Sequence, residues 1–165
     1  MTDSIQKELA TKIGARLHTS LGLTLIKGIV YQIAPDYQPD SGILLHGAQQ
    51  WPFVSISAIL PEQFLIEEST NVSAAIIRTL TVAIVADKAV AELNDDSYAL
   101  YRQNAMRVLH THRWTGTLTS DPNACIMHAT VRPRSPIEQT AWMQYAKLVS
   151  AFDVLVQTDE PNTIT

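Results

Sequence analysis

The sequence predicts a single domain, residues 1–165, that mixes helices and strands. The chain has the usual length of one domain, and its hydrophobic content of 46% is enough to build a sizeable core. Apolar residues recur at near-helical spacing in two segments, one near the N-terminus and one after residue 97. Several other segments are rich in branched residues or alternate apolar with polar residues, which is typical of β-strands.

The first helix is expected over residues 4–20. Ser4 can cap its N-terminus, and Gly22 marks its end. Between them, the apolar residues at the spacing of one helical face are Ile5, Leu9, Ile13 and Leu17. Residues 23–35 follow and predict a strand, because they are rich in branched side chains and end at a proline.

A long loop or arm is expected over residues 35–52, which contain three prolines, two glycines and two aspartates. An ordered loop of this length in a small domain usually has a function. Its apolar insert, Ile43, Leu44 and Leu45, has no obvious place in the core of a monomer. Trp51 is an indole at the edge of an element, a position favoured for interface anchors. We expect these four residues to contact a neighbouring subunit.

Residues 51–60 alternate between two faces, which indicates a half-buried strand. Val54 and Ile56 are expected in the core. The serines that alternate with them, Ser55 and Ser57, are expected on the open side of the strand.

The middle of the segment 74–90 is apolar on both faces, and this pattern predicts a central strand covered on both sides. A turn at residues 67–71 precedes it. The second helix, around residues 98–113, follows the capping residues 94–97. After it we expect a loop at 114–124, a strand at 125–133, a short helix at 137–148, a strand at 149–158 and a disordered tail at 159–165.

One face of the second helix is apolar and gathers Tyr98, Tyr101, Ala105, Val108 and Leu109. We expect this face to cover the sheet that contains the strand at residues 80–85. The reason is that a strand apolar on both sides needs a layer on each side or a partner subunit.

Neither a metal site nor a catalytic centre is expected. His110 and His112 lie about 160° apart around a helix, whereas helical chelation uses side chains four residues apart. Cys125 and His128 are three residues apart in a predicted strand, so they should point to opposite faces. The chain contains no G-x-S-x-G motif, no S-x-x-K arrangement with its partner motifs and no glycine-rich phosphate loop, so we expect no cofactor.

The charges are unevenly distributed. With 12 Lys and Arg against 16 Asp and Glu, the formal net charge is -4, so the whole protein lacks the basic excess that favours nucleic-acid binding. The densest basic group consists of Arg102, Arg107, Arg113, Arg132 and Arg134. These arginines form either a solvated face or a partner surface. For the partner surface, the expected acidic counterparts on an adjacent subunit are Glu67, Glu68, Asp95 and Asp96.

Two further features concern the compartment. A single cysteine, Cys125, cannot form an internal disulfide, which suits a reducing environment, and we expect it as a small buried side chain in a strand. The N-terminal residues lack the basic and apolar regions of a secretory signal, and no apolar run is long enough to span a membrane. We therefore expect a soluble protein without a membrane partner.

In their order, these elements resemble the tail terminators, or tail-completion proteins, of tailed phages. The likeness rests on the N-terminal amphipathic helix, the Pro-rich loop and the segments TVAIVADKA, YALYRQNAMRVLH, CIMHATVRP, TAWMQYAKLVSA and FDVLVQT. The resemblance implies an α+β fold with an antiparallel sheet packed by two main helices. It also implies a structural virion protein, without enzymatic activity, that forms a ring, commonly a hexamer.

Such a ring caps the tail tube and joins it to the head or neck. Its partners would be further copies of the chain, the tail tube and the head-completion proteins of the neck, and DNA would pass through it without specific binding. The protein would be made in the host cytoplasm and end in the virion. A different connector or adaptor of the neck would have a similar sequence pattern. A small cytoplasmic ligand-binding domain or enzyme is the alternative from another class, and it would need a closed apolar pocket with converging polar groups.

Overall fold

The computed structural model describes residues 4–21, 28–32, 53–57, 62–87, 95–111, 116–134 and 147–162. The predicted arm at residues 35–52 and the predicted short helix up to residue 146 lie outside the described residues, as do Arg113 and residues 163–165.

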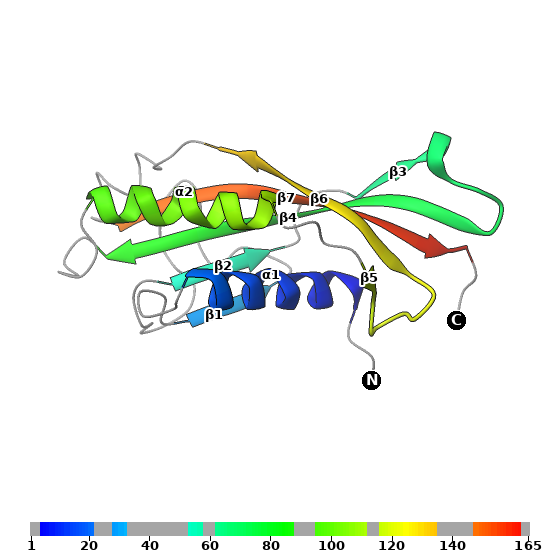
Figure 1. Ribbon diagram of the computed structural model, residues 1–165, viewed down its shortest axis with the longest axis horizontal. Helices are drawn as coiled ribbons and strands as arrows, with labels where there is room; N and C mark the ends of the chain where they lie inside the picture. Colours follow the sequence, from blue (N-terminus) through cyan, green and yellow to red (C-terminus); the bar gives the residue numbers. More distant parts are fainter. Residues whose placement is uncertain are drawn as a thin grey trace.

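The chain folds as an α+β domain with two α-helices, one 3-10 helix and seven strands within the described ranges (Figure 1). In chain order the elements are α1 (Ile5–Leu21), β1 (Gly28–Gln32), β2 (Phe53–Ser57), β3 (Gln63–Leu65), η1 (Ile66–Glu68), β4 (Ser73–Asp87), α2 (Asp95–Thr111), β5 (Gly116–Thr117), β6 (Cys125–Pro133) and β7 (Lys147–Pro161).

The strands form one curled sheet in the order β1-β2-β4-β7-β6-β5, and β3 pairs with β4 beside this path. Every pair is antiparallel except β1 and β2, which run parallel from Gly28 opposite Phe53 to Gln32 opposite Ser57. The expectation of a wholly antiparallel sheet is therefore wrong at this pair. A parallel pair needs a crossover of about a dozen residues or more, and the chain between β1 and β2, residues 33–52, is long enough to supply it.

The longest strands, β4 and β7, pair along their whole length, from Ser73 opposite Pro161 to Asp87 opposite Lys147. Fifteen residues per strand give a ribbon about 50 Å long. In Figure 1 this ribbon extends past both helices at the end where β3 and η1 lie. Two boundaries differ from expectation. Strand β7 includes residues 147–148, which were expected in a helix, and residues 159–161, which were expected in a disordered tail.

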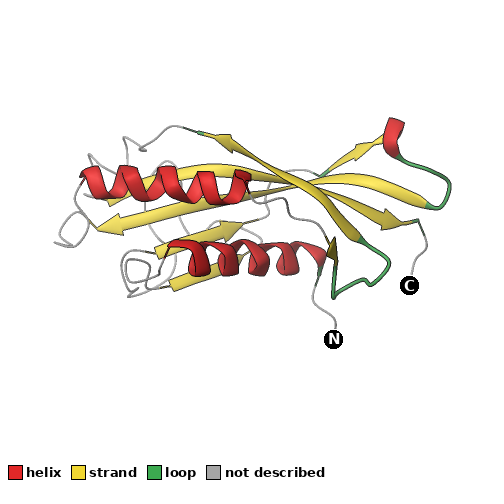
Figure 2. Cartoon of the chain, viewed as in Figure 1, coloured by secondary structure: helices red, strands yellow, loops and turns green. Residues whose placement is uncertain are grey.

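Both helices lie on the same side of the sheet (Figure 2). Helix α1 contacts α2, β1 and β4, whereas α2 contacts mainly β6 and β7. Helix α2 thus packs on the sheet that contains residues 80–85, over β6 and β7, whereas β4 contacts α1. The two helices and four strands share one core, whose fully buried members include Leu9, Ile13, Leu17, Ile56, Leu80, Ile84, Leu109 and Phe152.

The local sequence explains the positions of both helices. The Lys7 backbone N–H donates to Ser4 Oγ at 3.3 Å, so Ser4 caps α1 as predicted. Ala105 and Leu109 of α2 are fully buried, and Val108 is half-buried, which confirms that part of the predicted apolar face. Leu109 is a fully buried member of the core, and it therefore holds α2 against the sheet.

The second face of the sheet is also buried at its centre. Ser55 and Ser57 are 1% and 2% exposed, so the prediction of an open side at β2 is wrong. They lie in register with buried residues of β4, Ala83 and Thr81 respectively. Both faces of β2 are therefore buried. One face carries apolar side chains, and the other carries small polar side chains.

A β-bulge interrupts β6 between Ile126 and His128. Cys125 is opposite Asp159 and His128 is opposite Gln157, so Cys125 and His128 lie on the same face of the sheet. The expectation of opposite faces is therefore wrong, because the inserted residue resets the alternation. Cys125 is half-buried, whereas a buried thiol was expected.

Candidate assembly surface

A groove of about 370 Å³ lies between α2 and the end of β6. It is lined by Gln103, Met106, Arg107, His110, Val131 and Pro133. Met106 and Val131 are half-buried, whereas Arg107 and His110 are exposed. An apolar floor with a basic rim suits a partner that carries both an apolar and an acidic group.

The groove side of α2 continues toward the start of the helix. Leu100, Gln103, Arg107 and His110 follow the spacing of one helical stripe, and all four are exposed. Leu100 is 56% exposed although its side chain is large and apolar. The stripe thus joins an exposed apolar residue to the basic rim.

Two polar contacts hold the end of β6 beside α2. Arg102 Nη2 donates to the Arg134 carbonyl oxygen at 2.9 Å. Arg134 in turn pairs with Asp153 of β7, with 3.0 Å between Nη2 and Oδ1 and 3.1 Å between Nε and Oδ2. Asp153 is only 4% exposed and also accepts a hydrogen bond from Thr81 Oγ1 at 2.9 Å. A buried carboxylate with three such donors fixes the geometry of the strand end that borders the groove.

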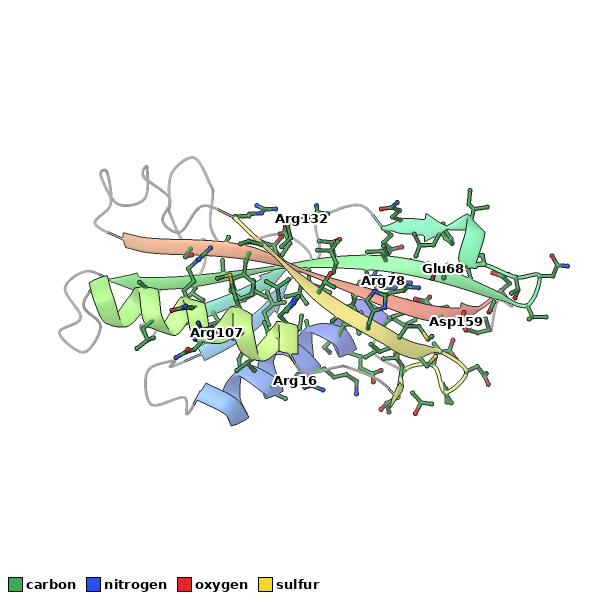
Figure 3. All side chains as sticks on the ribbon, turned by 45° about the horizontal axis from the view of Figure 1, so that its top comes forward. Arg16, Glu68, Arg78, Arg107, Arg132 and Asp159 are labelled. Carbon is green, nitrogen blue, oxygen red and sulfur yellow. The ribbon has the colours of Figure 1, made fainter. Side chains whose placement is uncertain are left out.

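A second surface lies at one end of the long axis, on the segment from β3 to the start of β4 (Figure 1). Its large apolar side chains are exposed: Phe64 is 61%, Ile66 85% and Val72 76% exposed. We call residues 62–73 the tip. It contains three glutamates and no lysine or arginine. Figure 3 shows Glu68 at this end of the molecule and Arg107 away from it, on α2.

An ion-pair cluster attaches the tip to the long strands. Arg78 of β4, 8% exposed, binds Glu160 of β7 through two bonds, Nε to Oε1 and Nη2 to Oε2, each 2.8 Å. Its Nη1 also donates to Glu62, which accepts a bond from Gln6 of α1 as well. A bidentate pair has a defined orientation, so this cluster sets where β3 leaves the sheet.

The turn within the tip has its own hydrogen bonds. Ser69 Oγ donates to the Leu65 carbonyl oxygen at 2.7 Å and accepts from the Ala75 N–H at 3.1 Å. Asn162 Nδ2 donates to the Thr70 carbonyl oxygen at 2.9 Å. The tip is therefore a structured projection whose apolar side chains are presented to solvent.

Glu8 of α1 fastens the turn between β5 and β6. Its carboxylate accepts bonds from the N–H groups of Thr119 and Ser120 at 2.8 and 2.7 Å, and from Ser120 Oγ at 2.7 Å. Burial acts to raise the pKa of Glu8, but these bonds and the charge of Lys12, 3.5 Å away, outweigh it. The pKa of Glu8 falls from 4.5 to about 2.

Four of the predicted interface residues, all arginines, lie in the described part of the chain. Arg102 and Arg134 are joined by a direct contact, and Arg107 lines the groove. Arg132 is exposed on β6, opposite Asp153 in the register. The remaining predicted residues lie outside the described ranges: Ile43, Leu44, Leu45, Trp51 and Arg113.

Sequence patterns did not identify the apolar tip. Phe64, Leu65 and Ile66 form an apolar run of the kind found in buried segments, and only the folded chain shows that Phe64 in β3 and Ile66 in η1 are exposed. Asp153 was also missed, because a lone aspartate in an apolar strand has no spacing that identifies its partners. The one available signal at the tip was the acidic run that follows Ile66.

Two other features to consider are a metal site and a membrane-spanning helix. Within the described ranges, no group of three or more His, Cys, Asp or Glu residues is placed to hold a metal ion. None of the helices in that part of the chain is long and apolar enough to cross a membrane.

The chain matches no protein-family model, and a comparison with curated protein sequences also finds no match.

Proposed function

We propose that the protein is a structural subunit of the phage neck, similar to a tail terminator, that assembles with copies of itself into a ring. The ring would cap the tail tube and contact the head-completion proteins of the neck. In this role the chain has no enzymatic activity and needs no cofactor. The subunit would be made in the host cytoplasm and function in the virion, where DNA passes the ring without specific binding.

The exposed apolar tip is the observation that supports this proposal. Large apolar side chains that are exposed together on one segment mark contacts with other proteins or with membranes. Here they are carried by an ordered hairpin that projects from the sheet, with Ile66 85% exposed. A projecting hairpin fits a protein that must reach a neighbouring subunit.

Removal of apolar area from the tip tests this function. The Phe64→Ser, Ile66→Ser double variant should keep the circular-dichroism spectrum of the parent, because both side chains are exposed. In sedimentation velocity the parent should form oligomers and the double variant should be mainly monomeric. The matched control is Met127→Ser, which removes a 49% exposed apolar side chain outside the tip and should assemble like the parent. A parent that stays monomeric over the whole concentration range would refute the proposal.

A further inference from the structure

We infer that the tip of one copy docks into the groove between α2 and β6 of the next copy, so that subunits join head to tail. This inference rests on the proposed function, because it names the partner of two surfaces within the assembly. The groove is the one lined by Met106, Val131 and Pro133 with Arg107 and His110 at its rim. The partner is the segment that carries Phe64, Ile66 and Glu68.

Charge complementarity is the first argument. Residues 97–120 and 122–137 contain arginines but no Asp or Glu, and β6 and most of α2 belong to these segments. Residues 62–73 contain no lysine or arginine, and of their three glutamates Glu62 is paired with Arg78 whereas Glu68 is exposed. Surfaces of opposite sign attract each other and suppress pairing of like surfaces, so tip-to-tip and groove-to-groove contacts are disfavoured.

Apolar complementarity is the second argument. The tip presents large side chains that have no cover, and the groove has a half-buried apolar floor with room for a side chain of the size of Ile66 or Phe64. Insertion of such a side chain into the groove would remove apolar area of both copies from water. An apolar anchor in a pocket surrounded by charged residues is the usual arrangement of a strong contact site.

The position of the two surfaces is the third argument. The tip lies at one end of the long axis, whereas α2 and the end of β6, which line the groove, lie away from it (Figures 1 and 3). A tip therefore does not meet the groove of its own copy. Contact between two different patches is heterologous, and such contacts close into rings when the rotation between subunits permits it.

A charge-reversal mixture tests the pairing. Alone, Arg107→Glu places its acidic rim against acidic tips, and Glu68→Lys places basic tips against basic rims. Each variant should therefore show an apparent dissociation constant at least about tenfold higher than the parent in sedimentation velocity. An equal mixture of the two should assemble again, because every tip can then find a groove of opposite charge. Glu68→Gln is the control for the loss of charge alone and should fall between the parent and Glu68→Lys.

A disulfide test measures proximity without relying on charge. In a Cys125→Ser background, Ile66→Cys copies are mixed with Gln103→Cys copies under mild oxidation, and heterodimers should form. Replacement of Gln103→Cys by Ala15→Cys, on an exposed position of α1, should abolish them. If the parent forms oligomers but the mixture does not recover and no heterodimer forms, the docking inference is wrong and the proposed function stands. If the parent never assembles, both are wrong.

Discussion

At the scale of single residues, buried or half-buried charges fix the connections between distant parts of the chain. Glu8 joins α1 to the turn before β6 across more than a hundred residues, and Asp153 joins β7 to the residue that follows β6. Each carboxylate accepts several bonds from defined donors. A buried carboxylate that loses such donors is strongly destabilising, so each of these residues is a specific structural requirement.

The acid sensitivity of the fold should depend on Glu8. Since the pKa of Glu8 is lower in the folded chain than the ordinary value of 4.5, the ionised carboxylate stabilises the fold above pH 4.5. This contribution is lost as the pH falls from 4.5 toward 2. At pH 7 we expect Glu8→Gln to lower the free energy of unfolding by about 1–2 kcal/mol, measured by urea denaturation.

The difference between parent and Glu8→Gln should shrink as the pH approaches 2. As a control, Glu68→Gln changes an exposed carboxylate that accepts a bond from Gln157 Nε2, and the new amide oxygen can accept the same bond. It should shift the free energy of unfolding by less than about 0.5 kcal/mol. An equal loss of stability at pH 7 and pH 2 would contradict the role assigned to the ionised carboxylate.

At the scale of elements, the position of the tip depends on the cluster around Arg78. Glu160 is nearly buried, with a side chain 12% exposed, and Arg78 is its bidentate partner. Removal of one member leaves an uncompensated charge at the place where β3 joins β4. The energetic cost should therefore appear first as loosening of the tip.

Substitution of Arg78 tests this dependence. Arg78→Met should lower the free energy of unfolding by about 3 kcal/mol, because Glu160 is left without its counter-charge. It should also raise amide hydrogen exchange at residues 63–68. Addition of Glu160→Leu should recover part of the loss, since an apolar pair of similar volume avoids the buried charge. A double variant whose loss equals the sum of the two single losses would show that Arg78 and Glu160 are energetically independent.

Some elements of the fold can be predicted from the sequence, and others cannot. Helix α1 and strand β4 were predictable, because Leu9, Ile13 and Leu17 repeat at helical spacing and β4 is apolar on both faces. Strand β3 is only three residues long, too short for a periodic pattern. The bulge after Ile126 has no local signature, and the parallel pairing of β1 depends on a partner that its own sequence does not specify.

At the scale of the whole molecule, the fold places Glu68 of the tip away from Arg107 beside the groove (Figure 3). The arginines of α2 and β6 could be recognised as a basic group from their sequence positions, and Glu67 and Glu68 as acidic counterparts. The groove beside Arg107 and the exposure of Ile66 could not be predicted from the sequence, because both depend on where separate elements meet in the folded chain. The formal net charge of the chain is -4. Assembly depends on the attraction between the oppositely charged tip and groove, so it should weaken when added salt screens that attraction.

Negative-stain electron microscopy of the purified parent chain tests most directly that the protein assembles head to tail. At low salt we expect closed rings of identical subunits with a central opening, which separate into single subunits when Arg107→Glu is introduced. Isolated 18.2-kDa particles at every protein concentration would contradict it. Symmetric dimers with tips in contact with tips would contradict it as well.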